Sequence, residues 1–181
     1  MKARVMVAGL AAAGLLALAG CGGSPQVAAY VGGPGNPVNV QVSQAEVDQV
    51  ATAIAATTSD AYDTAVSFSA AVMQIKVQSA VVAQVAKDKA ITVTDAQRDA
   101  FYASQELYPP LAKNPATRDF MIAYANTATI LSDQAAATAF SELMAKTPVR
   151  VNPRFGTWDD TVGSLVEGSS GSLSEAAPAK G

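Results

Sequence analysis

The chain has 181 residues, of which 50% are hydrophobic and 15% charged, and its formal net charge at pH 7 is −3. This acidic balance argues against binding to nucleic acid, or to anionic lipid through charge. The chain has no histidine and one cysteine, so it lacks the commonest general base and metal ligand and has no intrachain disulfide.

Residues 1–20 are typical of a secretory leader. Lys2 and Arg4 precede an apolar run at 5–18, which is short for a bilayer-spanning helix. The letters LAGC, which end at Cys21, resemble a bacterial lipobox. This resemblance implies cleavage before Cys21 and attachment of acyl chains such as palmitate, and two or more such chains anchor a protein stably. The alternative is an ordinary secretory signal followed by a chance cysteine.

The lipobox places the expected mature protein outside the cytoplasm, anchored by Cys21 to the outer face of the cell membrane. Residues 21–26 are rich in glycine and predict a short flexible tether. The chain that follows is long enough for one domain, which we expect over 27–160. Residues 161–181 are low in complexity and predict a disordered tail.

Two short strands are predicted at the start of the domain, over 27–31 and 38–42, with the turn formers "GGPGNP" between them. A third is predicted over 149–152, where Val149 and Val151 alternate with polar residues. Strands need partners for their amides and carbonyls. We therefore expect the third strand to pair with one or both of the others.

Between these strands the sequence predicts a helical body. Capping boxes that begin at Ser43 and Thr94 mark two helix starts. The intervening helix, roughly 60–89, carries two apolar rows, although a surface helix needs only one stripe. It should therefore pack on two sides or offer a surface to something else. The expected fold class is mainly α, with a small β element that joins the N-terminal and C-terminal strands.

Proline and capping residues predict the later helix boundaries. The Pro109-Pro110 pair should end the third helix, and the Asn114-Pro115 pair should start the fourth. The Ser132-Asp133 pair should cap the fifth. The strand should end near Pro153 and the chain should turn at Phe155-Gly156, so that Trp158, the only tryptophan, folds back onto the helices and is buried.

The sequence contains no Ser-x-x-Lys, G-x-S-x-G or Walker A motif, so it predicts neither an enzyme nor a cofactor or metal site. Apolar and aromatic residues recur on the predicted helices instead. Most should form the core, but some could line a groove that accepts varied peptides. The candidates for this apolar client-binding surface are Phe68, Val72, Met73, Ile75, Phe101, Tyr102, Met121 and Tyr124.

Several segments occur in the order expected of one family. "VAAYVGG", "VQVSQAEVDQV", "ITVTDAQRDAF", "NPATRDFMI" and "VRVNPRFGTWD" resemble the N-terminal chaperone domain of SurA-type proteins, particularly actinobacterial lipoproteins of the SurA/PrsA foldase group. The resemblance covers about 27–160. It implies a helical domain whose N-terminal strand meets the strand after the final helix, and it implies binding of unfolded or partly folded secreted chains.

Many such relatives also carry a parvulin prolyl-isomerase domain. This chain has no segment long enough to hold one and lacks the usual histidines, so the resemblance implies chaperone-like binding without catalysis. Two alternatives are an envelope lipoprotein that binds one defined protein partner and a protein that binds a small apolar ligand. A homodimer is compatible with each of the three.

Overall fold

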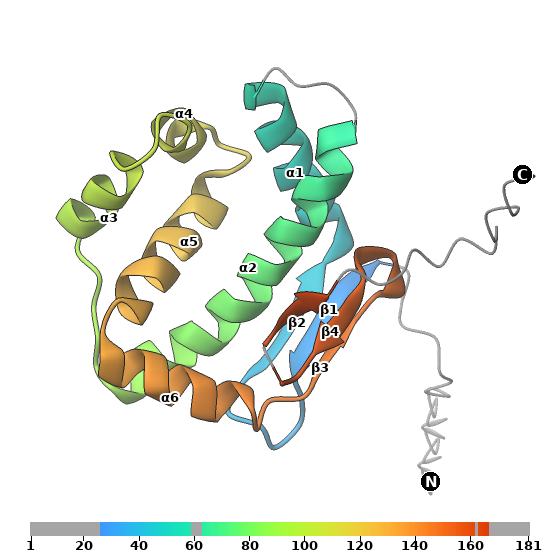
Figure 1. Ribbon diagram of the computed structural model, residues 1–181, viewed down its shortest axis with the longest axis vertical. Helices are drawn as coiled ribbons and strands as arrows, with labels where there is room; N and C mark the ends of the chain where they lie inside the picture. The colour runs from blue at the N-terminus through green and yellow to red at the C-terminus, as the bar shows by residue number, and fades with distance from the viewer. Residues whose placement is uncertain (1–25, 59–62, 162, 167–181) are drawn as a thin grey trace, which may run out of the picture.

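The computed structural model describes residues 26–58, 63–161 and 163–166, and within them the chain is mainly helical, as predicted. Six helices and a small sheet make up most of the described chain (Figure 1). The predicted leader, Cys21 and most of the predicted tether lie outside the described residues.

Three antiparallel strands form the main sheet: β1 (Val27–Gly32), β2 (Asn39–Ser43) and β3 (Val149–Val151). Their order is β2-β1-β3, so β1 is central. Tyr30 lies opposite Arg150 in the β1–β3 pair, and the guanidinium carbon lies 5.5 Å from the centre of the Tyr30 ring. The prediction that the late strand pairs with an N-terminal one is confirmed, and its partner is β1.

The turn between β1 and β2 requires glycine at its first position. Gly32 has φ +75°, and a Cβ atom there would lie 1.7 Å from the carbonyl oxygen of Val38. Asn36 stabilises the turn, because its side-chain oxygen accepts a hydrogen bond from the Val38 amide at 2.9 Å. The Asn36 side chain also donates to the Lys146 carbonyl at 3.0 Å, which ties the turn to the chain that enters β3.

Among the six described helices, α2 is the central one. The six are α1 (Gln44–Thr58), α2 (Asp63–Asp88), α3 (Asp95–Tyr102), α4 (Tyr108–Lys113), α5 (Arg118–Leu131) and α6 (Gln134–Met144). α2 contacts α1, α5 and α6 as well as strands β1 and β2. Its two apolar rows are therefore explained by packing on several sides within the domain.

Two predicted helix boundaries are wrong. α3 ends at Tyr102, well before the proline pair, and Pro109 and Pro110 lie in the first turn of α4. A proline is tolerated there because its missing amide would have no helical partner. Asn114 is the C-cap of α4, and α5 begins only at Arg118.

Two predicted helix starts are confirmed. Thr94 and Gln97 form the reciprocal capping box at the start of α3. Asp133 caps α6, where one of its carboxylate oxygens accepts from the Ala136 amide at 2.8 Å. Side-chain caps of this kind satisfy amides that would otherwise have no partner at the helix N-terminus.

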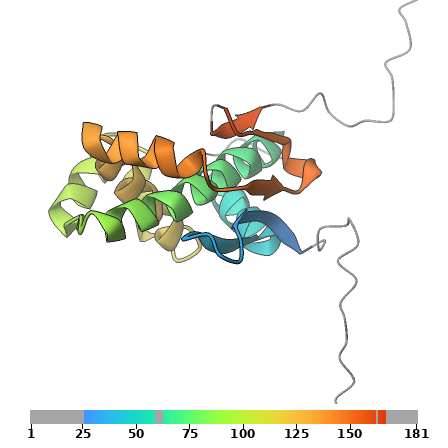
Figure 2. The ribbon, with the colours of Figure 1, turned by 90° about the horizontal axis from the view of Figure 1, so that it is seen from below.

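A C-terminal hairpin follows the main sheet. A short 3₁₀ turn (Pro153–Phe155) leads into β4 (Thr157–Asp159), which pairs with β5 (Ser164–Val166). β5 corrects the expectation of disorder at 164–166, whereas 167–181 of the predicted tail lie outside the described residues. The hairpin packs against α2, on a different side from β1 in Figure 2.

The prediction that Trp158 is buried holds only in part. Trp158 follows the turn as expected and lies in β4, but its ring is only half-buried against the main core. Its indole Nε1 is buried and has no hydrogen-bond partner among the described residues. Phe155, the residue expected to lie in the turn, is the more deeply buried of the two aromatics.

Ala90 ends α2 in a conformation that favours glycine. Its φ is +53°. The Ala90 amide donates to the Lys87 carbonyl at 3.3 Å and the Ile91 amide to the Ala86 carbonyl at 2.8 Å, which is the hydrogen-bond pattern of a Schellman motif. A left-handed backbone costs an alanine about 1–2 kcal/mol, and glycine avoids most of that cost.

Ala90→Gly is therefore expected to raise the free energy of unfolding by about 0.5–1 kcal/mol, since the relief of strain exceeds the extra entropy of an unfolded glycine. Chemical denaturation of both proteins measures this difference. Ala86→Gly is the matched control and should destabilise, because Ala86 has an ordinary helical backbone within α2. Destabilisation by both substitutions would contradict the assignment of strain to Ala90.

Candidate functional site

An aromatic cluster joins α3, α4 and α5. It consists of Phe101, Tyr102, Tyr108, Phe120 and Tyr124. Phe120 is buried, whereas the other four rings are half-buried. The cluster therefore spans from the core to the surface, on the part of the molecule farthest from the sheet (Figure 1).

Phe101 is the centre of the aromatic cluster. Its ring stacks on Tyr108 at 5.1 Å and meets Tyr124 edge-on at 5.0 Å, as measured between ring centroids. The hydroxyl groups of Tyr108 and Tyr124 lie 3.3 Å apart. Each such ring pair stabilises the fold by about 0.5–1.5 kcal/mol beyond the contribution of its buried area. These contacts therefore hold the rings in defined positions.

Polar contacts hold α3 and α5 in a defined register. Arg98 on α3 donates to the Val93 carbonyl at 2.8 Å and to the Asn126 side chain on α5 at 3.1 Å. The two helices run in opposite directions (Figure 1). Tyr102 lies one helical turn after Arg98 on α3, and Ile122 lies one helical turn before Asn126 on α5. Because the helices are antiparallel, these two residues lie at the same level along the helix pair.

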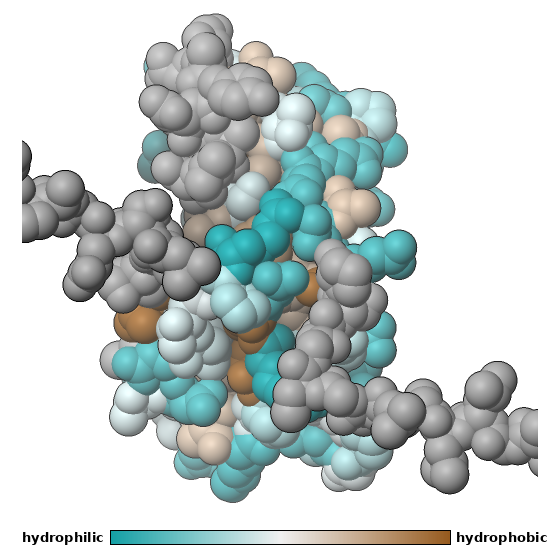
Figure 3. Space-filling view, turned by 90° about the vertical axis from the view of Figure 1, so that its right-hand side faces the viewer, coloured by the Kyte–Doolittle hydropathy of each residue, from teal (hydrophilic) through white to brown (hydrophobic). Residues whose placement is uncertain are grey.

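Ile122 is an exposed apolar residue on α5, at the level of Tyr102 on α3. It is 38% exposed and is one of three large hydrophobic residues that are exposed in the described chain. The other two, Val40 and Val166, lie on strands β2 and β5. Where grey atoms do not cover it, the face that carries the sheet shows apolar residues scattered among hydrophilic ones (Figure 3). The aromatic rings instead gather where α3, α4 and α5 meet, so the aromatic cluster with Ile122 is the better candidate for an apolar binding surface.

Burial changes the acid–base behaviour of two tyrosines in the cluster. Burial, reinforced by the hydrogen bond with Tyr124, raises the pKa of Tyr108 to about 12. Burial also raises the pKa of Tyr102 above its usual 10.0, against the opposing charge of Arg98. Both hydroxyl groups therefore stay protonated, and able to donate hydrogen bonds, over the whole physiological range.

We expect the raised pKa of Tyr108 to make the fold alkali-sensitive. The unfolded tyrosine ionises near pH 10.0 and the folded one near pH 12, so the folded state holds the proton more tightly. The free energy of unfolding should be unaffected by Tyr108 below pH 10 and should fall as the pH rises toward 12. Denaturant unfolding across this range measures the fall, which Tyr108→Phe should reduce; an equal fall in both proteins would contradict the assignment.

The predicted client-binding residues divide into three groups. Val72, Met73 and Met121 are fully buried in the main core, so their assignment to a surface is wrong. Phe68 and Ile75 are half-buried on α2. The remaining three, all half-buried, come together in the aromatic cluster: Phe101, Tyr102 and Tyr124.

Two members of the aromatic cluster, Tyr108 and Phe120, were not among the residues predicted for the client-binding surface. Of these two, only Tyr108 is half-buried. It follows a loop and directly precedes the two prolines, and the sequence predicted that α3 would end there. If the two prolines are interpreted as the start of a helix instead of the end of one, the sequence predicts Tyr108 at the beginning of α4. Val149 and Val151, predicted as structural residues, are half-buried on β3 and pair with β1.

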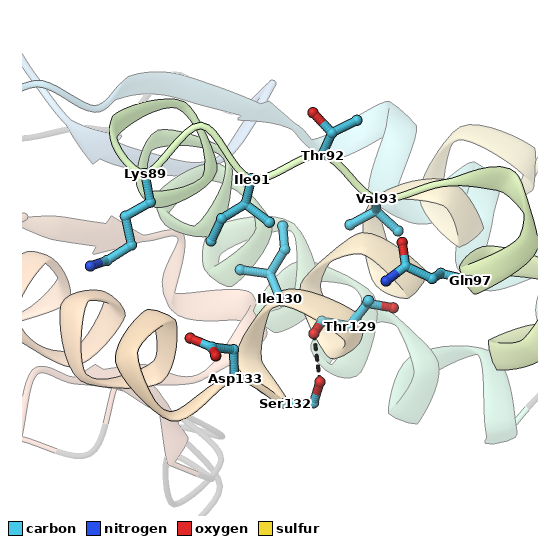
Figure 4. A pocket seen from close by; sticks show the side chains of 9 residues that line it. All are labelled: Lys89, Ile91, Thr92, Val93, Gln97, Thr129, Ile130, Ser132 and Asp133. Atoms are coloured by element: carbon cyan, nitrogen blue, oxygen red, sulfur yellow. Dashed lines mark hydrogen bonds between the residues drawn. The ribbon is translucent and has the colours of Figure 1, made fainter.

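A separate hollow lies at the opposite end of α5 (Figure 4). Its volume is about 630 Å³, and the residues between α2 and α3 and at the α5–α6 corner line it. Its lining mixes charged, neutral polar and aliphatic side chains and includes no member of the aromatic cluster. This composition does not suit the small, purely apolar ligand that was one alternative from the sequence.

Among the residues described, no helix has the length and apolar character needed to cross a membrane. The same residues contain no group of three acidic or cysteine side chains that could hold a metal ion. No family model matches the chain, and neither a curated protein nor a solved structure matches it.

Proposed function

We propose that this protein is a membrane-tethered, extracytoplasmic chaperone-like protein that binds unfolded or partly folded secreted polypeptides without catalysis. The observation that carries the proposal is the aromatic cluster with its half-buried rings, together with the exposed Ile122 on α5. Unfolded chains expose apolar side chains and unpaired backbone groups at the same time. A receptor for them therefore needs apolar area and hydrogen-bonding groups on one surface.

The aromatic cluster offers both. Tyrosine supplies a large apolar ring, loses little side-chain entropy on binding and ends in a hydroxyl that can donate or accept. Tyr102 and Tyr108 are half-buried, so their rings are partly accessible while α3 and α4 hold them in place. Contacts that depend on area and on backbone groups discriminate little between sequences, which suits binding to many clients.

Two features of the sequence support the remaining parts of the proposal. The lipobox-like residues that end at Cys21 support a lipid anchor on the outer face of the membrane. The resemblance of residues 27–160 to SurA-type chaperone domains supports non-native clients. Replacement of Cys21 by serine should abolish acyl labelling and release the protein from the membrane fraction; membrane retention of an unlabelled wild-type protein would contradict the anchor.

Aggregation of chemically denatured clients tests the binding role. The chain from residue 22 onward should delay light scattering by several unrelated denatured proteins at stoichiometric ratios. The double variant Tyr102→Ala/Ile122→Ser should lose most of this effect. The matched control is Val40→Ser, because Val40 is 41% exposed, close to the 38% of Ile122, but lies on β2 away from the aromatic cluster.

Three results would count against the proposal. An absence of suppression by the wild-type protein would remove the chaperone role. Equal loss in the double variant and in Val40→Ser would remove the aromatic cluster as its site. Suppression confined to one of several clients would favour the alternative of an envelope lipoprotein with one defined partner.

A further inference from the structure

The hollow beside α5 contains binding chemistry that the proposed function does not use. Its volume of about 630 Å³ falls within the range of small-molecule sites. Ile91, Val93 and Ile130 lie between its two ends (Figure 4). Val93 is 9% and Ile130 5% exposed, so these side chains form a well-anchored apolar floor.

Two opposite charges lie at one end of this floor. Lys89, at the end of α2, and Asp133, the N-cap of α6, both line the hollow and lie away from Gln97 (Figure 4). One oxygen of Asp133 accepts from the Ala136 amide, and no ion pair joins Asp133 to Lys89. The hollow therefore presents an ammonium and a carboxylate that do not neutralise each other.

The other end of the hollow is neutral. The side-chain oxygen of Gln97 accepts from the Thr94 amide at 2.9 Å and from its hydroxyl at 3.0 Å. These bonds turn the amide nitrogen of Gln97 toward the hollow (Figure 4). Along one wall, the Ser132 hydroxyl donates to the Thr129 carbonyl at 2.7 Å. The walls are thus fixed by bonds within the protein before any ligand arrives.

We infer that this hollow binds a small zwitterion of the α-amino-acid class with an apolar side chain. Lys89 pairs with the ligand carboxylate and Asp133 with the ligand ammonium. These two groups are neighbours in such a molecule, and the two residues line the same end of the hollow (Figure 4). The side chain lies on Ile91, Val93 and Ile130, and Gln97 bounds its length. This site is separate from the aromatic cluster, so the inference does not rest on the chaperone role.

Calorimetric titration with free leucine tests the inference on the chain from residue 22 onward. Leucine should bind with millimolar or tighter affinity. Glycine, which lacks the side chain, should bind at least about tenfold more weakly. N-acetyl-leucine and leucine amide each lack one of the two charges of leucine. Each should also bind at least about tenfold more weakly than leucine, because it loses a charge-assisted hydrogen bond.

Two substitutions test the charged end. Asp133→Asn removes the charge but keeps the helix cap, since asparagine caps as well as aspartate. Lys89→Gln removes the positive charge of the lysine ammonium, and Lys89 is an exposed residue. Each should weaken leucine binding about tenfold while the melting temperature is unchanged. The matched control is Asp119→Asn, at the other end of α5, which should bind leucine like the wild-type protein.

Each outcome decides the inference. The inference would be overturned if titration with leucine gave no heat of binding and did not shift the amide resonances of residues 89–97 and 129–133. Equal affinity for glycine and leucine would overturn the apolar floor, and unchanged affinity in both variants would overturn the charged end. Because client aggregation is measured separately, failure here leaves the chaperone proposal standing.

Discussion

Truncation after Pro148 is expected to abolish cooperative unfolding of the domain. The truncated chain loses β3, the 3₁₀ turn and the hairpin, and with them the bond from the Asn152 amide to the Ala28 carbonyl at 2.8 Å. It also loses the packing of Phe155 and Trp158 on the core. Loss of one buried aromatic costs about 3–5 kcal/mol and each orphaned buried backbone group about 1–3. These losses together approach the whole stability of a typical domain, about 5–15 kcal/mol.

Thermal unfolding followed by circular dichroism measures this effect. The control is truncation after Val166, which keeps every described element and should leave the melting temperature unchanged. Trp158→Ala gives a milder form of the same test and should cost about 3 kcal/mol, at the low end of the range because the ring is only half-buried. A cooperative transition of normal amplitude in the chain that ends at Pro148 would contradict the role given to β3.

Met121→Ala should destabilise the protein by about 2–5 kcal/mol, whereas Ile122→Ala should change its stability by about 0.5 kcal/mol or less. The two residues are neighbours on α5, but Met121 is 1% exposed and Ile122 38% exposed. Truncation of Met121 leaves a cavity in the main core, among residues that include Met73 and Val77. Truncation of Ile122 removes mainly surface area, and alanine compensates through its higher helix propensity.

Denaturant unfolding of both variants compares them on one helix and in one experiment. The pair also separates stability from function, because Ile122 belongs to the proposed client-binding surface and Met121 does not. Equal destabilisation by both substitutions would show that Ile122 is packed in the core, and the aromatic cluster would then lose its exposed edge.

The features that could be predicted from the sequence are those fixed by neighbouring residues. The capping box of Thr94 and the cap of Asp133 depend on contacts across one helical turn. The pairing of β3 was predictable without knowledge of its register, because a strand must find a partner and few candidates exist. Only the structure shows that this partner is β1, with Val151 opposite Ala29.

The features that could not be predicted depend on residues far apart in the chain. Val72 and Met73 are as apolar as an exposed binding surface would be, and only the packing of β1, α1 and α5 around α2 makes them core. The prolines at 109 and 110 fit both a helix end and a helix start by local rules. The hollow is assembled from 89–97 and 129–133, and no pattern within either segment predicts the other.

The central position of β1 also sets an order of events during folding. β2 follows β1 after a short turn, so this pair can form early, whereas β3 is more than a hundred residues away in the chain. Until β3 is synthesised and the helices have packed, the second edge of β1 has no strand beside it. Long-range closure of this kind slows folding and leaves an edge to which other chains can pair. We therefore expect refolding yield to fall steeply as protein concentration rises.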